Sequence, residues 1–245
     1  AEAITDTTCL VSVMYANNET GAIQPIREIG ALCRKRGVLF HTDAVQAAGH
    51  LAIDVQRDNI DMLSLSAHKF HGPKGIGLLF AKSNIQLTSL IRGGGQERGK
   101  RAGTENLPGI IGLAAALKDA QENMQQNTAY ITGLRDALRN GLDKIDGADF
   151  NGSREHCLPG TVNYSFQGLN GEALLSLLSN EGICCSSGSA CSAGSLEPSH
   201  VLLALGLSHE TAQSALRFSL CEYNTMNEVQ TIITKVTEAI NRLRR

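Results

Sequence analysis

Two short polar segments carry side chains whose types could take part in catalysis. In one, Lys69 follows His68 and stands three residues after Ser66, just before a Gly/Pro turn. In the other, Asp43 follows an apolar stretch and Gln46 comes three residues later. Both segments follow predicted strands, and ligands of open α/β sheets bind at the carboxyl ends of strands. An acid at one strand end and a lysine at another suit pyridoxal phosphate (PLP), which needs a lysine for a Schiff base and an acidic partner for its ring nitrogen.

Each of these residues also has an ordinary structural interpretation. Taken alone, Lys69 would be a solvated lysine in a loop, where that residue type is usually found. Taken alone, Asp43 would cap a helix that follows it. The cofactor interpretation depends on the two segments together, with Ser66 and His68 as hydrogen-bond donors to a phosphate.

Composition and charge exclude several classes of protein. The chain has 245 residues, of which 42% are hydrophobic, so it can form a core and is not a disordered chain. Twenty-two basic and 24 acidic residues give a net charge of −2 without a block of like charge, which argues against a nucleic-acid partner. No apolar run reaches the ~18 residues of a membrane span, and no signal peptide is visible.

The cysteines predict a reducing compartment. Their number, seven, is odd, which favours the cytoplasm over a secreted disulfide framework. Three of them lie close together but lack paired C-x-x-C spacing, so we expect no metal site. We expect most cysteines in the core, namely Cys9, Cys33, Cys157, Cys184, Cys185 and Cys221, although Cys157 could instead be exposed.

Hydrophobic patterning predicts the elements that would position these residues. Four strands are expected before residue 105, at 9–15, 38–43, 61–67 and 75–81. A helix with Pro25 at its first position and Gly37 just past its end separates the first two, so a βαβ unit and a mostly parallel sheet are expected. Further along, we expect helices at 107–124, 128–145, 172–181, 198–205, 209–215 and 226–244, and strands at 161–166, 182–185 and 217–220.

Six short motifs stand in a fixed order along nearly the whole chain. They are ANNETG (16–21), HTDAVQ (41–46), SAHKFHGPKG (66–75), GGGQERGKRAGTEN (93–106), SSGSACSAGSLEPSH (186–200) and RFSL (217–220). Together they closely resemble cysteine desulfurases of the nitrogen-fixation and housekeeping iron–sulfur type, in the class V aminotransferase group. The resemblance implies an α/β chain of PLP fold type I, with an incomplete, mostly parallel large-domain sheet (1–122) and a smaller C-terminal α+β domain (123–245).

The resemblance also implies a role for each matched residue. Lys69 is implied to bind PLP covalently and then to move the proton of the substrate Cα. Asp43 is implied to contact the pyridinium nitrogen, Gln46 the phenolic oxygen, and Asn18 to lie beside the ring and the substrate carboxylate. Ser66 and His68 are implied to hold the phosphate, and Thr104 to reach the phosphate of a neighbouring subunit. Arg217 is implied to bind the substrate α-carboxylate, which suits a forked guanidinium; a surface salt bridge is the alternative.

Cys191 is the nucleophile that the resemblance implies. Its thiolate would take sulfur from L-cysteine, giving L-alanine and a persulfide for iron–sulfur cluster or thio-cofactor assembly. Because a free thiol has a pKa of ~8.5, its pKa must be lowered or the thiol deprotonated within the complex. The small, polar residues around Cys191 predict a loop that carries sulfur to an acceptor protein such as an iron–sulfur scaffold. The implied enzyme is a cytoplasmic homodimer.

The family pattern places about a third of such a protein before the first residue of this sequence. The chain is therefore expected to be a fragment, half of a split protein or a degenerate relative, and to bind PLP poorly by itself. Two other functions stay open. One is a selenocysteine lyase or a desulfurase of a modification pathway, and the other is a non-catalytic scaffold.

Overall fold

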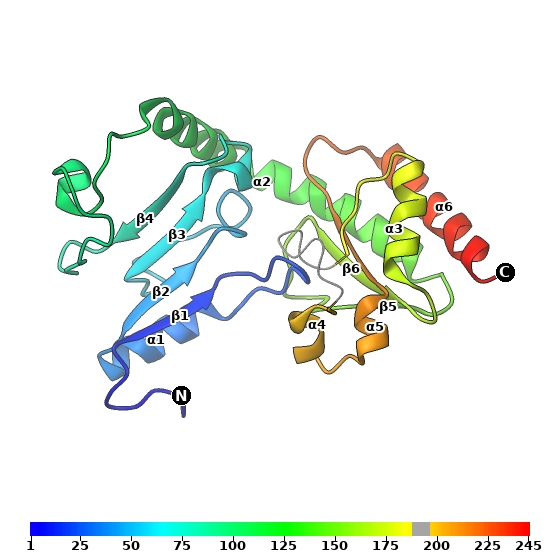
Figure 1. Ribbon diagram of the computed structural model, residues 1–245, viewed down its shortest axis with the longest axis horizontal. Coiled ribbons are helices and arrows are strands. Elements are labelled where there is room, and N and C mark those ends of the chain that lie inside the picture. The colour runs from blue at the N-terminus through cyan, green and yellow to red at the C-terminus, as the bar shows by residue number, and fades with distance from the viewer. Residues whose placement is uncertain (188–196) are drawn as a thin grey trace. The chain divides into compact units, whose positions relative to one another are not determined.

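The computed structural model describes residues 1–187 and 197–245, and their contacts divide them into two units (Figure 1). Unit 1 comprises Ala1–Tyr15 and Gln24–Met124. Unit 2 comprises Ala16–Ile23 and Gln125–Arg245. The short segment 16–23 thus clusters with the C-terminal half of the chain, although it follows the first strand. The domain boundary near residue 122 stays a prediction.

Unit 1 contains a four-stranded sheet in sequence order. Its strands are β1 (Leu10–Met14), β2 (Leu39–Asp43), β3 (Met62–Ser66) and β4 (Gly77–Ala81). The first three are parallel, and β4 returns antiparallel to β3. The predicted strands and the mostly parallel sheet are therefore confirmed.

Helix α1 (Ile26–Arg36) connects β1 to β2. It buries Ile26 and Cys33, and it ends at Gly37, whose φ of 68° lets its N–H reach the carbonyls of Arg34 and Cys33. Pro25 is the residue before the helix rather than its first residue, so the predicted start was one residue early. The βαβ unit itself is confirmed.

Two 3-10 turns and a long helix complete unit 1. The turns are η1 (Ala67–Phe70) and η2 (Gln96–Gly99). Helix α2 (Leu107–Leu142) runs without a break from unit 1 into unit 2, so the prediction of two separate helices was wrong. The polar residues 125–128 suggested a connection, but they include neither Pro nor Gly, and nothing in their backbone chemistry stops a helix.

Unit 2 has a three-stranded antiparallel sheet, β5 (Ala148–Phe150), β6 (Thr161–Phe166) and β7 (Ala215–Ser219), with β6 in the centre. Its helices are α3 (Gly171–Asn180), α4 (His200–Ala204), α5 (His209–Gln213) and α6 (Met226–Leu243). Every residue of β6 is buried, and Tyr164 and Phe166 share one core with Leu174 of α3 and Val236 of α6. Helix α6 begins with a capping box formed by Thr225 and Glu228.

The predicted strand at 182–185 is absent from the described structure. Gly182 has a φ of 77°, and only Ser186 forms a bridge, with Arg217 of β7. Ile183 is buried and Cys184 is exposed, which corrects the expectation that Cys184 lies in the core.

The remaining cysteines divide between core and surface. Cys33 and Cys157 are buried as expected, whereas Cys185 and Cys221 are only half-buried. Cys9 is exposed because it precedes β1 and contributes to neither the sheet nor the helix beside it, so its predicted core position was wrong.

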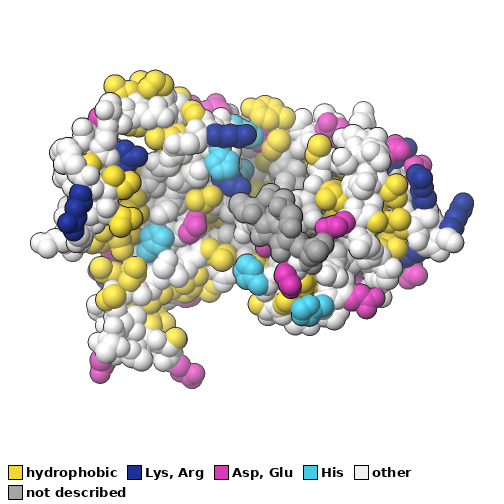
Figure 2. Space-filling view, in the orientation of Figure 1, with side chains coloured by type: hydrophobic (Ala, Val, Ile, Leu, Met, Phe, Trp, Pro, Cys, Tyr) yellow, Lys and Arg dark blue, Asp and Glu magenta, His cyan; other side chains and the backbone are white. Residues whose placement is uncertain are grey.

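Unit 1 does not bury all of its apolar side chains. Yellow hydrophobic side chains lie on the surface in Figure 2, and exposed examples include Leu79 on β4 and Leu90, which is 95% exposed. None of the described helices is long and apolar enough to cross a bilayer. Within residues 1–187 and 197–245, no group of three or more His, Cys, Asp or Glu side chains is placed to hold a metal ion.

Candidate active site

The two polar segments of unit 1 follow neighbouring strands of its sheet. Asp43 is the last residue of β2 and Ser66 is the last residue of β3. These strands are parallel, with Asp43 beside Ser64, and the N–H of Ala44 donates to the Ser64 carbonyl at 2.9 Å. Asp43 and Ser66 therefore lie at the same edge of the sheet, where ligands bind in open α/β folds.

Asp43 begins a series of turns rather than a regular helix. Its Oδ1 accepts the N–H of Val45 at 2.9 Å, which is a local cap of the kind expected for an isolated Asp. Its side chain is exposed, and in the described part of the chain its Oδ2 accepts no hydrogen bond. One carboxylate oxygen thus orients the side chain while the other can face a ligand. Gln46 lies in the same turns and is half-buried.

Lys69 lies in η1, immediately after β3. The turn is fixed because Ala67 and Phe70 are buried on either side of the lysine. His50 contacts the Lys69 carbonyl through Nε2 at 3.3 Å, which further fixes the lysine backbone. The side chain of Lys69 is half-buried and that of His68 is exposed.

An open hollow of about 480 Å³ lies beside this turn in unit 1. Its lining includes Ser66, His68, Lys74 and Gly75. A hydroxyl, an imidazole and an ammonium group together suit an anionic ligand. Lys74 belongs to the motif SAHKFHGPKG, but the resemblance gives it no role, so its place in this hollow was not predicted. Gly77 is required here because a Cβ at this position would lie 2.8 Å from the Leu65 carbonyl oxygen of β3.

Thr104 lies in unit 1, in the exposed stretch between η2 and α2. Asn18 and Arg217 lie in unit 2, where Arg217 Nη1 donates to the Asn18 carbonyl at 2.9 Å. The two residues implied to bind the substrate carboxylate are therefore in direct contact. Cys191 lies outside the described residues.

The turn at 16–23 is held in unit 2 by backbone and side-chain bonds. Ala22 forms a bridge with Cys157, and the N–H of Leu158 donates to the Gly21 carbonyl at 2.8 Å. Within the turn, Asn17 Oδ1 accepts the N–H groups of Glu19 and Thr20, each at 2.9 Å. These bonds fix the backbone carbonyl that Arg217 contacts.

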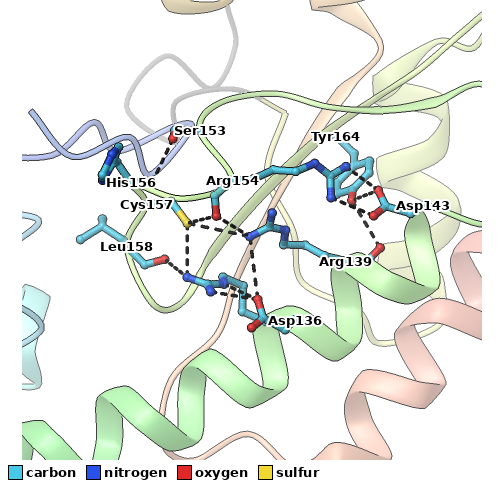
Figure 3. A network of polar contacts seen from close by, with 10 residues as sticks. Asp136, Arg139, Asp143, Ser153, Arg154, His156, Cys157, Leu158 and Tyr164 are labelled. Atoms are coloured by element: carbon cyan, nitrogen blue, oxygen red, sulfur yellow. Dashed lines mark hydrogen bonds and ion pairs between the residues drawn. The ribbon is translucent and has the colours of Figure 1, made fainter.

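A charged network supports the segment that contains Cys157 (Figure 3). Arg135 Nη1, in α2, donates to Cys157 Sγ and to the Leu158 carbonyl, both at 3.2 Å. Arg139, one turn further along α2, donates to the Arg154 carbonyl at 3.3 Å. Both guanidinium groups therefore hold the segment that forms the bridge with Ala22.

The other end of this network is a carboxylate. Arg154 donates two bonds to Asp143, at 2.8 and 2.9 Å, and the buried Tyr164 hydroxyl donates a third at 2.5 Å. The bonds from Arg154 hold the pKa of Asp143 below its ordinary value. Burial, followed by the neighbouring Asp143, raises the pKa of Tyr164.

We expect Asp143→Ala to lower the free energy of unfolding by about 1–2 kcal/mol at pH 7, because the buried Tyr164 hydroxyl loses its shorter bond and keeps only the Arg139 carbonyl, at 3.4 Å, as acceptor. Since the folded-state pKa of Asp143 lies below the unfolded value of ~3.9, its contribution is present above that pH and is lost as the pH falls further. Denaturant titrations at pH 7 and pH 3 would measure the difference. Asp146→Ala is the control, since that exposed side chain forms no bond in the described structure. If Asp143→Ala lowered the free energy of unfolding equally at pH 7 and pH 3, the stabilising role of the ionised Asp143 carboxylate would be contradicted.

Comparison with known proteins identifies the family. Residues 1–232 match the family described as Aminotransferase class-V. The chain is 51% identical over 245 residues to a protein named cysteine desulfurase IscS from Clostridium botulinum, covering 99% of this chain and 62% of that protein. It is 48% identical over 242 residues to a protein of the same name from Methanosarcina thermophila, covering 99% of this chain and 60% of the relative.

Solved structures give the same result for the fold. A NifS-like protein superimposes with a TM-score of 0.90 at 39% identity, covering 99% of this chain and 64% of that one. DndA from Streptomyces lividans gives a TM-score of 0.74 at 36% identity, over 89% of this chain and 62% of that one. The chain thus spans about 60–62% of the length of the curated relatives it matches. It has the α/β fold of NifS-like proteins, as the motifs predict, and it belongs to the class V aminotransferase family.

Proposed function

We propose that this chain is the greater part of a PLP-dependent cysteine desulfurase. The observation that carries the proposal is the placement of Asp43 at the end of β2, with Ser66 and Lys69 at the end of the adjacent parallel strand β3. A similar protein with the printed name cysteine desulfurase is 51% identical over the whole chain. Family and geometry therefore support the same activity.

The donor set of unit 1 fits PLP in its chemistry. A carboxylate with a free oxygen suits a protonated ring nitrogen, and a lysine can form the Schiff base. The hollow lined by Ser66, His68 and Lys74 offers donors to a phosphate. When bound, the cofactor would supply an electron sink for bonds at the substrate Cα.

The protein's own residues would then bind the substrate and move its protons. Lys69 would carry the proton at the substrate Cα, and Asp43 would keep the ring nitrogen charged. Gln46 would hydrogen-bond the phenolic oxygen of the ring. Arg217, beside Asn18, would hold the α-carboxylate through its fork of N–H donors.

Sulfur transfer requires a second nucleophile, for which we propose Cys191. Its sulfur would form an S–S bond with the substrate sulfur as the substrate Cβ–S bond breaks. Cys191 is oxidised to a persulfide, and the substrate carbon is reduced to the methyl group of L-alanine. No other oxidant or reductant is needed, because the two changes balance.

We also propose a second subunit, a sulfur acceptor and a cellular compartment for this activity. Thr104, on an exposed segment of unit 1, would contact the phosphate held by a second subunit in a homodimer. An acceptor protein such as an iron–sulfur scaffold would remove the sulfur. The thiol chemistry suits the reducing cytoplasm.

The test is to incubate the complete protein with PLP and L-cysteine, and to measure L-alanine together with one added sulfur atom on the Cys191 peptide. Equal amounts of both are expected in a single turnover. Activity with selenocysteine that survives Cys191→Ala would instead support a selenocysteine lyase. Failure of the complete protein to develop the yellow colour of bound PLP would support a non-catalytic scaffold.

A further inference from the structure

The segment that contains Cys191 is attached to unit 2 at both of its ends. We call residues 187–198 the Cys191 segment; it begins after Ser186 and ends before Ser199. Ser186 and Arg217 exchange backbone hydrogen bonds of 3.0 and 2.7 Å. At the other end, the Ser199 hydroxyl accepts the N–H groups of Val201 and Leu202 and so caps α4.

Each of these two attachment points is also hydrogen-bonded to the turn at 16–23, and the two residues contacted there, Asn18 and Glu19, are consecutive. Arg217, which pairs with Ser186, donates to the Asn18 carbonyl at 2.9 Å. The Ser199 hydroxyl donates to Glu19 Oε2 at 2.5 Å. Two neighbouring residues, Asn18 and Glu19, therefore contact the residues that flank the Cys191 segment, and Glu19 lies 180 positions before Ser199 in the sequence.

Glu19 is a rigid anchor. Its side chain is only 2% exposed, and its backbone is fixed because Asn17 Oδ1 accepts its N–H and Asn163 donates to its carbonyl at 3.1 Å. A buried carboxylate is costly unless it receives hydrogen bonds. The short bond from Ser199 is therefore strongly favoured, and it places the end of the Cys191 segment at a defined point of unit 2.

We infer that Glu19 is a positioning residue for sulfur transfer, acting through Ser199 on the segment that carries Cys191. The inference rests on the proposed function. Transfer requires the thiolate to meet the substrate sulfur, and small displacements of a reacting group reduce rates sharply. Glu19 touches neither the substrate nor the cofactor in this scheme, so its loss should affect transfer and spare substrate binding.

The first experiment compares Glu19→Ala with Glu19→Gln. We expect Glu19→Ala to slow persulfide formation on Cys191 in a single turnover by about tenfold. Glu19→Gln keeps an oxygen that accepts from Ser199 and should stay within about threefold of the parent protein. The affinity for L-cysteine, measured by spectral titration in a Cys191→Ser background, should change less than about twofold in either variant. Equal loss in both variants, or a loss confined to substrate affinity, would overturn the inference.

The second experiment distinguishes the loss of the Glu19–Ser199 hydrogen bond from the loss of a helix N-cap in general. Ser199→Ala should reproduce the effect of Glu19→Ala. Ser208→Ala is the matched control, because Ser208 caps α5 through the N–H of Thr211 but has no link to Glu19. If Glu19→Ala does not fold, the comparison of Ser199→Ala with Ser208→Ala decides the question. Similar rates for those two variants would contradict the inference.

A third measurement needs neither cofactor nor turnover. Alkylation of Cys191 by iodoacetamide, followed by peptide mass spectrometry, should be at least about threefold faster in Glu19→Ala and Ser199→Ala than in the parent, because one end of the segment is released. The exposed Cys9 of unit 1 serves as the internal reference. If the parent protein makes no L-alanine, the proposed function fails, yet this measurement still tests the anchor. Unchanged alkylation would overturn it.

Discussion

In the complete protein, Lys69→Ala is expected to abolish the yellow colour of bound PLP near neutral pH and to reduce L-alanine formation from L-cysteine by at least about 10³-fold. The physical reason is that Lys69 is the lysine in η1 at the edge of the sheet where Asp43 and Ser66 end their strands. Removing its amine removes both the covalent bond to the cofactor and the group that moves the Cα proton. Absorbance spectra and product assays on the same sample would measure the two effects.

The control for this variant is Lys118→Ala. Lys118 lies on an exposed face of α2, with a weak ion pair to Glu122 at 3.8 Å. Its removal should leave colour and turnover unchanged. An active Lys69→Ala protein would show that another amine binds the cofactor, and Lys74 in the neighbouring hollow would then be the next residue to test.

Cys191→Ser is expected to keep the colour and the binding of L-cysteine while losing persulfide formation and L-alanine production by at least about 10³-fold. A serine hydroxyl is far less nucleophilic than a thiolate, so it does not accept sulfur under these conditions. Spectral titration with L-cysteine and single-turnover product analysis would separate binding from transfer.

Cys184→Ser is the matched control for the nucleophile. Cys184 is exposed and lies seven residues before Cys191, so a thiol in the same part of the chain is removed. The variant should behave like the parent. Detection of the persulfide on Cys184 or Cys185 would move the nucleophile to that position.

The sheet of unit 1 was predictable from local sequence because each strand is a short apolar run that ends in turn residues. The strand ends were predictable for the same reason, and Asp43 and Ser66 are the last residues of β2 and β3. Helix α2 was split in the prediction because polarity was taken as a break, although only Pro or Gly would have opposed the helix there.

The environment of Glu19 could not be predicted from the sequence. An acid in a polar turn motif is normally solvated, and its burial depends on partners at Asn163 and Ser199 that lie 144 and 180 positions away. The charged network around Asp143 could not be predicted from the sequence either. The spacing of four residues indicates that Arg139 of α2 and Asp143, just past the end of that helix, lie on the same side, but it does not show that Arg154 and the Tyr164 hydroxyl converge on the same carboxylate.

The membership of residues 16–23 in unit 2 has a consequence for how the chain folds. Their contacts with Asn163, Ser199 and Arg217 close loops of 144, 180 and 199 residues. Closure entropy grows only with the logarithm of loop length, so the longest of these loops costs about 0.3 kcal/mol more than the shortest. Once one such contact has formed, the others follow at little extra cost, and the segment docks as a unit. Contacts of this range form late in folding, so substitutions in residues 16–23 should accelerate unfolding far more than they slow refolding.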